Sequence, residues 1–460
     1  MDFSSLLRQQ RASFQTGATR SLEFRRAQLR RLQAALERHE ASLLEAIHAD
    51  LRRAAHDAYL SEIGFVLREI HYALRNLPAW MKPQRRSVPL LARPGRAWVQ
   101  PEPLGVALIL GPWNYPVQLL LLPLVSALAA GNCAVLKPSE FAPHTAEAIA
   151  RLIRDTFSED YVAVCPGGRD VAEALLREQF DKIFFTGGTA AGRAVMAAAA
   201  KHLTPVTLEL GGKCPCLVCA DAPLEVTARR IAWGKFMNAG QTCVAPDFVL
   251  AEQPIRHRLL EALQRAVREF YGDDPRQSPH YGRIVNRRHF ERLTGLLNAG
   301  RIVCGGQQDV DTLYLAPTIL ADVPPDAPVM QEEIFGPILP VLTFEQLDEA
   351  LAKLADRPTP LALYLFTNDR AVQQRVLART RSGGVCLNDT VMHLLSKDLP
   401  FGGLGESGMG AYHGRAGFEA FSHYRSVLRR GFWPDFRLRY PPPRVGLPTL
   451  RRMARWLLGE

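Results

Sequence analysis

At 460 residues the chain is too long for one ordinary hydrophobic core, so two or more domains are expected. With 47% hydrophobic and 22% charged residues, its composition is that of a soluble globular protein. The net charge is +10, but residues 425–460 alone carry +7, and no folded basic module interleaved with aromatic residues is found. The charge therefore argues against a nucleic-acid-binding protein.

Eight cysteines are scattered along the chain without a secretory signal before them. Residues 1–40 mix arginines with Glu23, Glu37 and Glu40, which fits neither a secretory apolar segment nor an acid-poor transit peptide. We therefore expect free thiols in a reducing compartment, the cytoplasm.

Apolar residues between 22 and 51 recur at the spacing of an amphipathic helix. The basic, proline-rich stretch that follows, up to about residue 103, indicates an extended arm. The apolar runs 104–112, 133–140 and 182–188 then each end in a polar or glycine-rich turn, as buried parallel strands do. Helical patterns lie between these runs, so the order strand, helix, strand predicts an α/β protein with a doubly wound parallel sheet.

A second α/β region is predicted from about residue 209 to about residue 399. Prolines around 441–448 predict a loop, and "LRRMARWLLG" near the end predicts a short basic amphipathic segment. No run of 18 apolar residues occurs, so no transmembrane anchor is predicted.

Ligands of doubly wound sheets bind outside the carboxyl ends of the strands, which puts Asn114, Lys137, Glu140 and residues 187–192 at one rim. Glycines there let a dinucleotide approach a helix N-terminus, but the spacing is not G-x-G-x-x-G, and a plain strand-to-helix turn explains them equally well. Cys243, three residues after a glycine, is open to two interpretations of equal weight: a thiol presented to a cleft, or a buried structural cysteine.

Seven motifs occur in a fixed order. They are "PWNYP" (112–116), "KPSE" (137–140), "FTGGTAAG" (185–192), "LELGGK" (208–213), "NAGQTC" (238–243), "EEIFGP" (332–337) and "PFGGLGESGMG" (400–410). Together they resemble the aldehyde dehydrogenase superfamily over about residues 5–430. The short lead before the first motif, with "CVAPD" and "YHGRAGFEAFSH" (412–423), resembles its class 3 branch of fatty and aromatic aldehyde enzymes.

This resemblance implies three catalytic residues. Cys243 matches the nucleophile, whose thiolate adds to the aldehyde and passes through a thiohemiacetal to a thioester, and a thiolate needs an electropositive, partly exposed setting. The Asn114 amide and the Cys243 N–H match the oxyanion donors. Glu209 matches the general base that hydrolyses the thioester, with a pKa raised by partial desolvation. Without the motifs, Asn114 would be interpreted as a turn residue and Glu209 as a capping or surface carboxylate.

The resemblance also implies an NAD site, with NADP accepted as it is in the class 3 branch. The matching positions are Lys137 and Glu140 at the adenosine ribose, Gly187, Gly188 and Gly192 at the pyrophosphate turn, Gly211 in the same set, and Glu333 and Phe335 at the nicotinamide ribose and ring. A carboxylate near the ribose 2′-hydroxyl favours NAD. The alternatives are a surface lysine for Lys137 and a core aromatic residue for Phe335.

One stretch departs from the family pattern. Cys214, Cys216 and Cys219 lie close together where relatives have Asn or Ser after the lysine. Zinc sites want four ligands, so no metal site is predicted, and the alternation of Cys214 and Cys216 indicates one face of a strand. His413 is expected in a supporting or subunit-contact role.

The expected organisation follows from these motifs. It comprises an NAD-binding domain (1–80 and 104–208), a catalytic domain (209–399), a small β oligomerisation arm (81–103 and 400–430) that makes a homodimer, and a basic tail (431–460). The predicted reaction is NAD(P)-dependent oxidation of medium- or long-chain aliphatic or aromatic aldehydes to carboxylic acids.

Two alternatives stay open at this stage. A CoA-acylating reductase would use a thiol instead of water to resolve the thioester, and a structural or aldehyde-scavenging protein would keep the fold with incidental turnover. For the tail, Leu450, Met453, Trp456 and Leu457 with Arg451, Arg452 and Arg455 predict peripheral contact with an anionic membrane, and a solvated or subunit-packed tail is equally expected.

Overall fold

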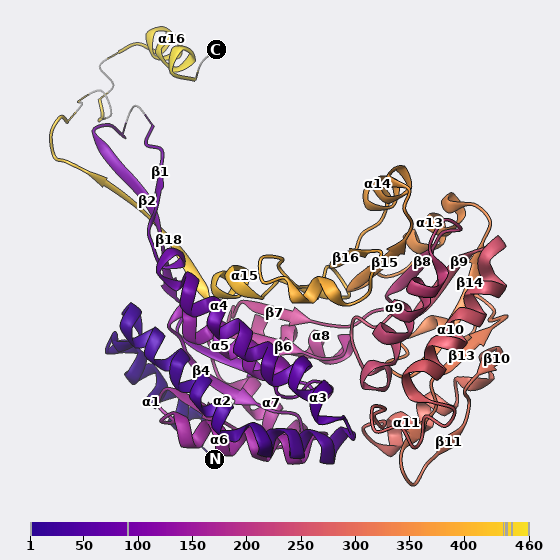
Figure 1. The fold of residues 1–460 in the computed structure, drawn as a ribbon. Helices are drawn as coiled ribbons and strands as arrows, with labels where there is room; N and C mark the ends of the chain where they lie inside the picture. Colours follow the sequence, from indigo (N-terminus) through magenta and orange to yellow (C-terminus); the bar gives the residue numbers. More distant parts are fainter. Residues whose placement is uncertain (1, 90–91, 436, 438–439, 443–444, 459–460) are drawn as a thin grey trace.

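The structure, a computed structural model, describes residues 2–89, 92–435, 437, 440–442 and 445–458 (Figure 1). Its helices are α1 (Phe3–Gln15), α2 (Leu22–Leu51), α3 (Ala55–Ala58), α4 (Gly64–Trp80), α5 (Gln118–Ala130), α6 (Pro143–Thr156), α7 (Arg169–Arg177), α8 (Thr189–Ala200), α9 (Leu224–Phe236), α10 (Arg256–Tyr271), α11 (Arg287–Thr294), α12 (Pro328–Gln331), α13 (Leu347–Ala355), α14 (Arg370–Arg379), α15 (Gly414–Ala420) and α16 (Leu447–Leu458). Shorter helical turns used below are η2 (Tyr59–Ile63), η4 (Met237–Gly240) and η7 (Met392–Leu395).

The strands form three larger sheets and one two-stranded ribbon. They are β1 (Gln84–Arg86), β2 (Gly95–Pro103), β3 (Val106–Leu110), β4 (Cys133–Lys137), β5 (Val162–Val164), β6 (Lys182–Thr186), β7 (Val206–Glu209), β8 (Pro215–Val218), β9 (Phe248–Glu252), β10 (Arg301–Cys304), β11 (Gln308–Asp309), β12 (Tyr314–Leu315), β13 (Thr318–Ala321), β14 (Ile338–Phe344), β15 (Ala362–Phe366), β16 (Gly384–Leu387), β17 (Gly408–Met409) and β18 (Ser422–Arg430).

The first sheet has the order β17-β7-β6-β3-β4-β5 and is parallel except for β17. From β3 the chain moves outward in one direction to β4 and β5, and then in the other direction to β6 and β7. Because strand crossovers are right-handed, this reversal puts helices on both faces and opens a crevice between the carboxyl ends of β3 and β6.

Helix α5 shows why this sheet is stable. Every residue of α5 is buried, because the helix lies on β3 and β4 and is covered in turn by α2, α4 and α15. It ends at Gly131, whose φ of 89° is the left-handed conformation that glycine adopts without a Cβ penalty. Helix α2 begins at Ser21, whose side chain accepts a hydrogen bond from the Phe24 N–H, and it spans the predicted range 22–51.

The second sheet has the order β10-β13-β14-β9-β8-β15-β16, with only β10 antiparallel. It forms the body drawn in pink and orange in Figure 1, beside the indigo and purple body of the first sheet. Residues 210–214 connect β7 directly to β8, so the chain crosses from one body to the other in a single short segment.

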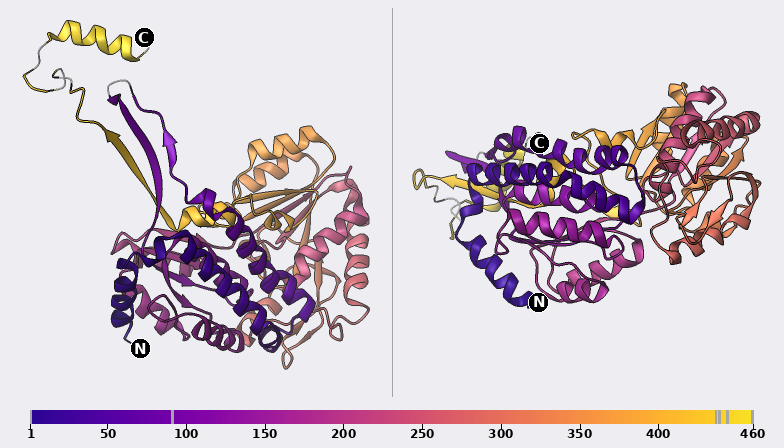
Figure 2. Two further views of the ribbon diagram at one scale, coloured as in Figure 1. Left: turned by 60° about the vertical axis from the view of Figure 1, so that its left-hand side comes forward. Right: turned by 60° about the horizontal axis from the view of Figure 1, so that its bottom comes forward.

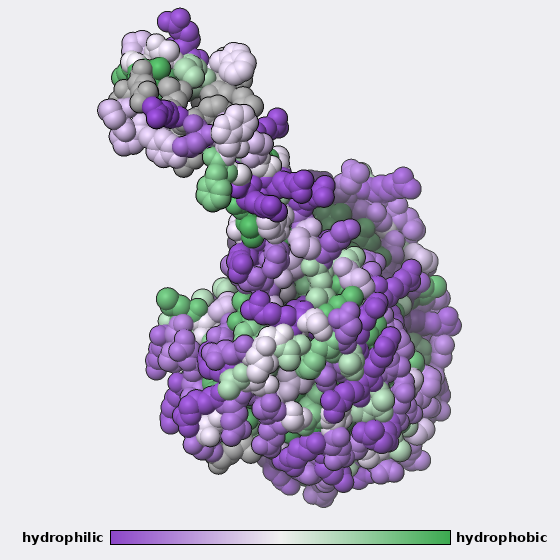
Figure 3. Space-filling view, turned by 90° about the vertical axis from the view of Figure 1, so that its left-hand side faces the viewer, coloured by the Kyte–Doolittle hydropathy of each residue, from purple (hydrophilic) through white to green (hydrophobic). Residues whose placement is uncertain are grey.

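A ribbon of three strands, β1-β2-β18, projects from the two bodies, as both views in Figure 2 show. Strands β2 and β18 pair over their whole lengths, from Pro103 opposite Ser422 to Gly95 opposite Arg430. Figure 3 shows hydrophilic side chains interspersed with apolar ones over this arm and over the tail beyond it. All described side chains of α16 are exposed, and that of Leu457 lies outside the described ones.

The arm is smaller than the predicted range 400–430. Of residues 400–430, only those of β18 belong to the arm. Gly408 in β17 pairs with Glu209 of the first sheet, and α15 packs against α5. The segment around 400–421 therefore returns to the body of the first sheet before the chain enters the arm. Among the helices that the structure describes, none is long and apolar enough to span a bilayer.

Candidate active site

A cavity of about 730 Å³ opens where the crevice of the first sheet faces the segment between β7 and β8. Its walls come from four places in the chain: the turn after β3, the turn after β6, the β7–β8 connection, and loops of the second body. Of the residues predicted from the sequence, the cavity brings together Asn114, Gly187, Gly188, Glu209, Gly211, Cys243, Glu333 and Phe335. These eight residues are spread over nearly half of the chain and meet only in the folded protein.

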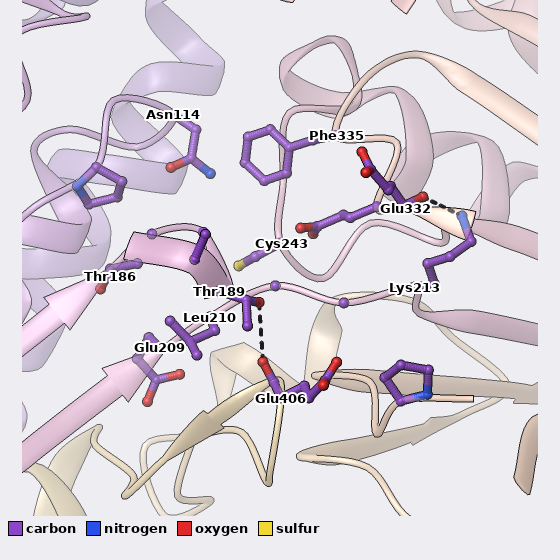
Figure 4. A pocket seen from close by; sticks show the side chains of 18 of the residues that line it. Asn114, Thr186, Thr189, Glu209, Leu210, Lys213, Cys243, Glu332, Phe335 and Glu406 are labelled. Atoms are coloured by element: carbon purple, nitrogen blue, oxygen red, sulfur yellow. Dashed lines mark hydrogen bonds between the residues drawn. The ribbon is translucent and has the colours of Figure 1, made fainter. Parts of the chain in front are cut away.

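Cys243 lies partly exposed in the wall of this cavity, and Figure 4 shows its sulfur directed into the open space. Burial raises the pKa of the thiol far above its ordinary value, and the Glu333 and Glu209 carboxylates raise it further. The backbone N–H groups of Cys243 and Val244 act in the opposite direction. In the free protein, two carboxyl groups and two backbone N–H groups thus act on this thiol in opposite directions.

The chain reaches Cys243 through three successive residues in the left-handed region: Asn238 (φ 50°), Ala239 (φ 52°) and Gly240 (φ 74°). Non-glycine residues pay for this conformation, roughly 1 kcal/mol or more each, so other contacts must hold the turn. Gln241 is the main clamp. Its side-chain amide donates to Asn238 O (3.0 Å) and to Arg283 O (2.9 Å).

Asn114 is buried and its amide points into the cavity (Figure 4). Its Nδ2 donates to the Gln241 backbone carbonyl at 3.0 Å, and the backbone carbonyl of Asn114 accepts from the Asn238 side chain at 2.8 Å. This amide is therefore tied to the turn that carries Cys243. Nδ2 has a second hydrogen, which leaves one N–H available on the cavity side.

Glu209 ends β7 and is only 2% exposed, which excludes the capping and surface alternatives. Burial raises the pKa of its carboxyl well above the ordinary value, and neither oxygen has a hydrogen-bond partner among the described residues. In Figure 4 the carboxylate points away from the Cys243 sulfur. The residue lines the same cavity, but in this conformation its carboxylate does not face the thiol.

Glu333 and Phe335 lie on the loop that closes the other side of the cavity. Loss of solvation raises the pKa of the Glu333 carboxyl to about 8, with Asp247 adding to the rise, whereas the Gly212 N–H is the first of the groups that lower it. A Cβ on Gly211 would stand 2.0 Å from a Glu333 oxygen, so only glycine lets the carboxylate lie against this backbone.

The loop that carries Glu333 is held by a half-buried lysine. Lys213 donates to Asp247, to Val329 O and to Glu332 O, the last two at 2.8 Å. Figure 4 shows the contact between Lys213 and Glu332. A lysine directly after "GG" in the sequence therefore fixes the loop instead of facing a ligand.

Three of the predicted cofactor residues, Lys137, Glu140 and Gly192, lie outside the cavity lining. Lys137 is the last residue of β4, and its Nζ donates to Glu140 at 2.6 Å, so the two form a local ion pair beside the crevice. Lys137 is buried, which excludes the surface alternative. Gly192 lies inside α8, where a Cβ would stand 2.6 Å from Leu210, and it serves the packing of that helix.

Sequence reasoning missed several lining residues. Trp113 lies edge-on to Phe335 with ring centroids 5.4 Å apart and packs at the same distance against His289. Trp113 directly precedes Asn114 in the "PWNYP" motif, and this position in the sequence indicated that it lies near the site. His289 and Arg292 lie on α11, far from any motif, and no pattern in the sequence indicated them.

The cysteine cluster and His413 have other surroundings. Cys214, Cys216 and Cys219 are all buried along β8, and no group of three or more His, Cys, Asp or Glu in the described part of the chain is arranged to hold a metal. His413 is buried too, with its ring stacked on Phe401 at 5.4 Å.

Comparison with known proteins identifies the family of the chain. The aldehyde dehydrogenase family matches residues 1–427. Aldehyde dehydrogenase family 3 member B1 of Mus musculus is 50% identical over 96% of this chain and 94% of that protein. The aldehyde dehydrogenase of Rattus norvegicus named dimeric NADP-preferring is 46% identical over 97% of this chain and 99% of its own length. The solved substrate-bound AldH of Staphylococcus aureus has a TM-score of 0.96 at 43% identity, covering 99% of this chain and all of that one.

The predicted α/β fold and the predicted class 3 relationship are thereby confirmed. The chain belongs to the aldehyde dehydrogenase family and is an NAD(P)-dependent aldehyde dehydrogenase.

Proposed function

We propose that this enzyme oxidises medium- to long-chain aliphatic or aromatic aldehydes to carboxylic acids with Cys243 as nucleophile. One observation carries the proposal: a partly exposed thiol shares a cavity with a tethered amide, Asn114, and with a buried carboxyl that has no partner, Glu209. These are the groups that attack, oxyanion stabilisation and hydrolysis require.

In the first step the Cys243 thiol loses its proton to water, its sulfur adds to the aldehyde carbon, and the C=O π electrons move to the oxygen, which becomes an oxyanion. The free N–H of Asn114 Nδ2 and the backbone N–H of Cys243 stabilise this charge, and loss of one such donor costs about 100- to 1000-fold in turnover. The bound NAD(P) supplies the acceptor for the hydride that leaves the carbon. Cys243 is left as a thioester.

In the second step the Glu209 carboxylate takes a proton from water, which attacks the thioester and releases the acid and the Cys243 thiolate. Because burial raises its pKa well above the ordinary value, the Glu209 carboxylate is a stronger base than an exposed glutamate. The carboxylate has to turn toward the sulfur for this step. Because no hydrogen bond to a described residue holds either oxygen, the rotation breaks no contact of this kind.

The residues present fit a dinucleotide. A Cβ on Gly188 would meet nothing within 4 Å, so the start of α8 is open toward the cavity at the place where a helix N-terminus favours phosphate. Gly187 and Gly188 would hold the pyrophosphate, Lys137 and Glu140 the adenosine ribose, and Glu333 with Phe335 the nicotinamide end. Glu140 favours NAD, while the rat relative is named NADP-preferring, so both cofactors are proposed.

The preference for apolar aldehydes is supported by exposed apolar side chains on elements next to Cys243. Trp233 on α9 is 41% exposed, and Met392 and Leu395 on η7 are 41% and 37% exposed. The two elements touch, because Thr390 Oγ1 donates to Arg230 O at 2.6 Å just ahead of η7. The alkyl chain or aromatic ring of a substrate would pack against these exposed side chains.

We also propose the domain division 1–80 and 104–208, 209–399, and an arm from 81–103 and 422–430 that joins two copies. The arm supports this role because β1 and β18 are both edges of an otherwise isolated three-stranded ribbon. Light scattering of the purified chain tests it: a mass of two chains is expected, and a monomer contradicts it.

For the tail we propose contact with an anionic membrane surface. Support comes from α16, where exposed Trp456, Leu450 and Met453 accompany three arginines, and from the arm tip, where Phe432 and Trp433 are exposed. In a flotation assay with anionic and neutral vesicles, the full chain should float only with anionic ones. Equal binding by a chain cut after Tyr440 would contradict the proposal.

The function itself is tested by turnover of hexanal, a long-chain aldehyde and benzaldehyde with NAD or NADP. Replacement of Cys243 by Ala should lower turnover by about 10,000-fold or more. Undiminished turnover in that variant would contradict the mechanism. Product analysis with and without CoA separates the acid-forming reaction from the acyl-CoA-forming one.

A further inference from the structure

A second cysteine lies behind the nucleophile. Cys214 is fully buried at the start of β8, and its Sγ donates to Cys243 O at 3.5 Å. On its other side the same sulfur accepts from the Ala362 N–H at 3.3 Å. The thiol therefore connects the first residue of β15 to the backbone of the turn that presents Cys243.

The peptide group held in this way has a second end. A peptide is planar, so fixing the Cys243 carbonyl also fixes the Val244 N–H on the opposite side of the same plane. That N–H is one of the two backbone groups that lower the pKa of the Cys243 thiol. The carbonyl end of this peptide is thus bound to Cys214, and its N–H end acts on the Cys243 thiol.

The next peptide is held from the same side. The Tyr364 hydroxyl, fully buried on β15, donates to Val244 O at 2.5 Å. Ala362 and Tyr364 lie two residues apart on one strand, so a single element of the second sheet supports two consecutive peptides of the turn.

We propose that Cys214 is a positioning residue for the reaction: its thiol fixes the Cys243–Val244 peptide so that the N–H end faces the Cys243 sulfur. The inference rests on the proposed role of Cys243 as the nucleophile. Burial raises the pKa of the Cys214 thiol well above its ordinary value, so Cys214 keeps the proton that it donates.

The variants Cys214→Ala and Cys214→Ser test the proposal. Alanine removes the donor, whereas serine keeps an O–H in its place. The matched control is Cys216→Ala, which deletes an equally buried thiol two residues along. All four proteins are treated with iodoacetamide over a range of pH, and alkylation of Cys243 is followed by peptide mass spectrometry.

The Cys214→Ala variant should shift the pH dependence of Cys243 alkylation upward by about one unit, and kcat/KM for aldehyde should fall about tenfold below the thiol pKa. Cys214→Ser should restore both, and Cys216→Ala should match the wild type. An unshifted profile in Cys214→Ala, or an equal shift in Cys216→Ala, overturns the proposal.

Alkylation measures the reactivity of the Cys243 thiol without turnover. Its result is therefore independent of the proposed function, which the activity of Cys243→Ala tests. Should Cys214→Ala not fold, Tyr364→Phe removes the neighbouring support instead. An upward shift in that variant supports the positioning of these peptides, and an unshifted one overturns it.

Discussion

Two regions of the first body each bury a glutamate, and they treat it differently. Glu62 in η2 is 0% exposed, and one of its oxygens accepts from Arg53 at 2.6 Å. The other accepts from the N–H groups of Val117 (2.7 Å) and Gln118 (3.2 Å), which lie at the start of α5. Glu209 is 2% exposed, and neither of its oxygens has a hydrogen-bond partner in the described part of the chain.

The difference separates a structural carboxylate from a chemical one. Burying a charge costs several kcal/mol unless hydrogen bonds and an opposite charge compensate it. Around Glu62 the chain provides an opposite charge, Arg53, and two backbone N–H donors, so the carboxylate links η2 to the start of α5. Burial raises the pKa of both carboxyls, but Arg53 and two backbone N–H groups oppose the rise at Glu62. Around Glu209 no described group opposes it or donates a hydrogen bond to either oxygen, the pattern of an acid–base group.

The largest effect is expected when Glu209 is replaced by Gln. Turnover should fall by about 100- to 10,000-fold because the water loses its base, while the thioester on Cys243 still forms. Intact-protein mass spectrometry after mixing with aldehyde and NAD should show the added acyl group. The thermal midpoint should not fall, because no hydrogen bond is removed. Steady turnover close to the wild type would assign the base elsewhere.

The matched change at Glu62 should show the opposite profile. Glu62→Gln leaves Arg53 buried without its partner, which costs about 3–5 kcal/mol of unfolding free energy. Urea unfolding measures this loss. The kcat of the folded enzyme should stay within about twofold of the wild type, since Glu62 lies outside the cavity lining. A large fall in kcat without a loss of stability would erase the distinction between the two glutamates.

A smaller effect, confined to KM for NAD, is expected at the turn formed by Gly187 and Gly188. Gly188→Ala adds a methyl group that meets nothing in the free protein and projects into the cavity, so KM for NAD should rise about tenfold with an unchanged thermal midpoint. Gly187→Ala is the contrasting variant. Its Cβ would stand 2.5 Å from the Phe185 ring and should lower stability as well.

The smallest expected effect is a change in how stability depends on pH. The pKa of Glu333 is raised from 4.5 to about 8, so the folded protein keeps a proton that the unfolded chain loses. Its contribution is complete below about pH 4.5 and is lost as the pH rises to about 8. The thermal midpoint of Glu333→Gln should therefore fall less across this window than that of the wild type. Parallel curves would contradict the raised pKa.

Much of the fold was predictable because its signals are local. The apolar runs that became β3, β4 and β6 and the amphipathic pattern that became α2 depend on neighbours in the sequence. The boundary of the arm was not predictable in the same way. Residues 400–421 carry turn residues that fit either body, and only the pairing of Gly408 with Glu209 assigns them to the first sheet.

By itself the sequence determined the α/β class, the order of the strands along the chain and, through its motifs, the identity of Cys243, Asn114 and Glu209 as candidates. Only the tertiary structure decided that these residues share a cavity, that Glu209 lacks partners and points away from the sulfur, and that Cys214 supports the turn from behind. The physical reason is that burial and hydrogen-bond partners depend on segments far apart in the chain, whereas propensity and motif spacing depend on adjacent residues.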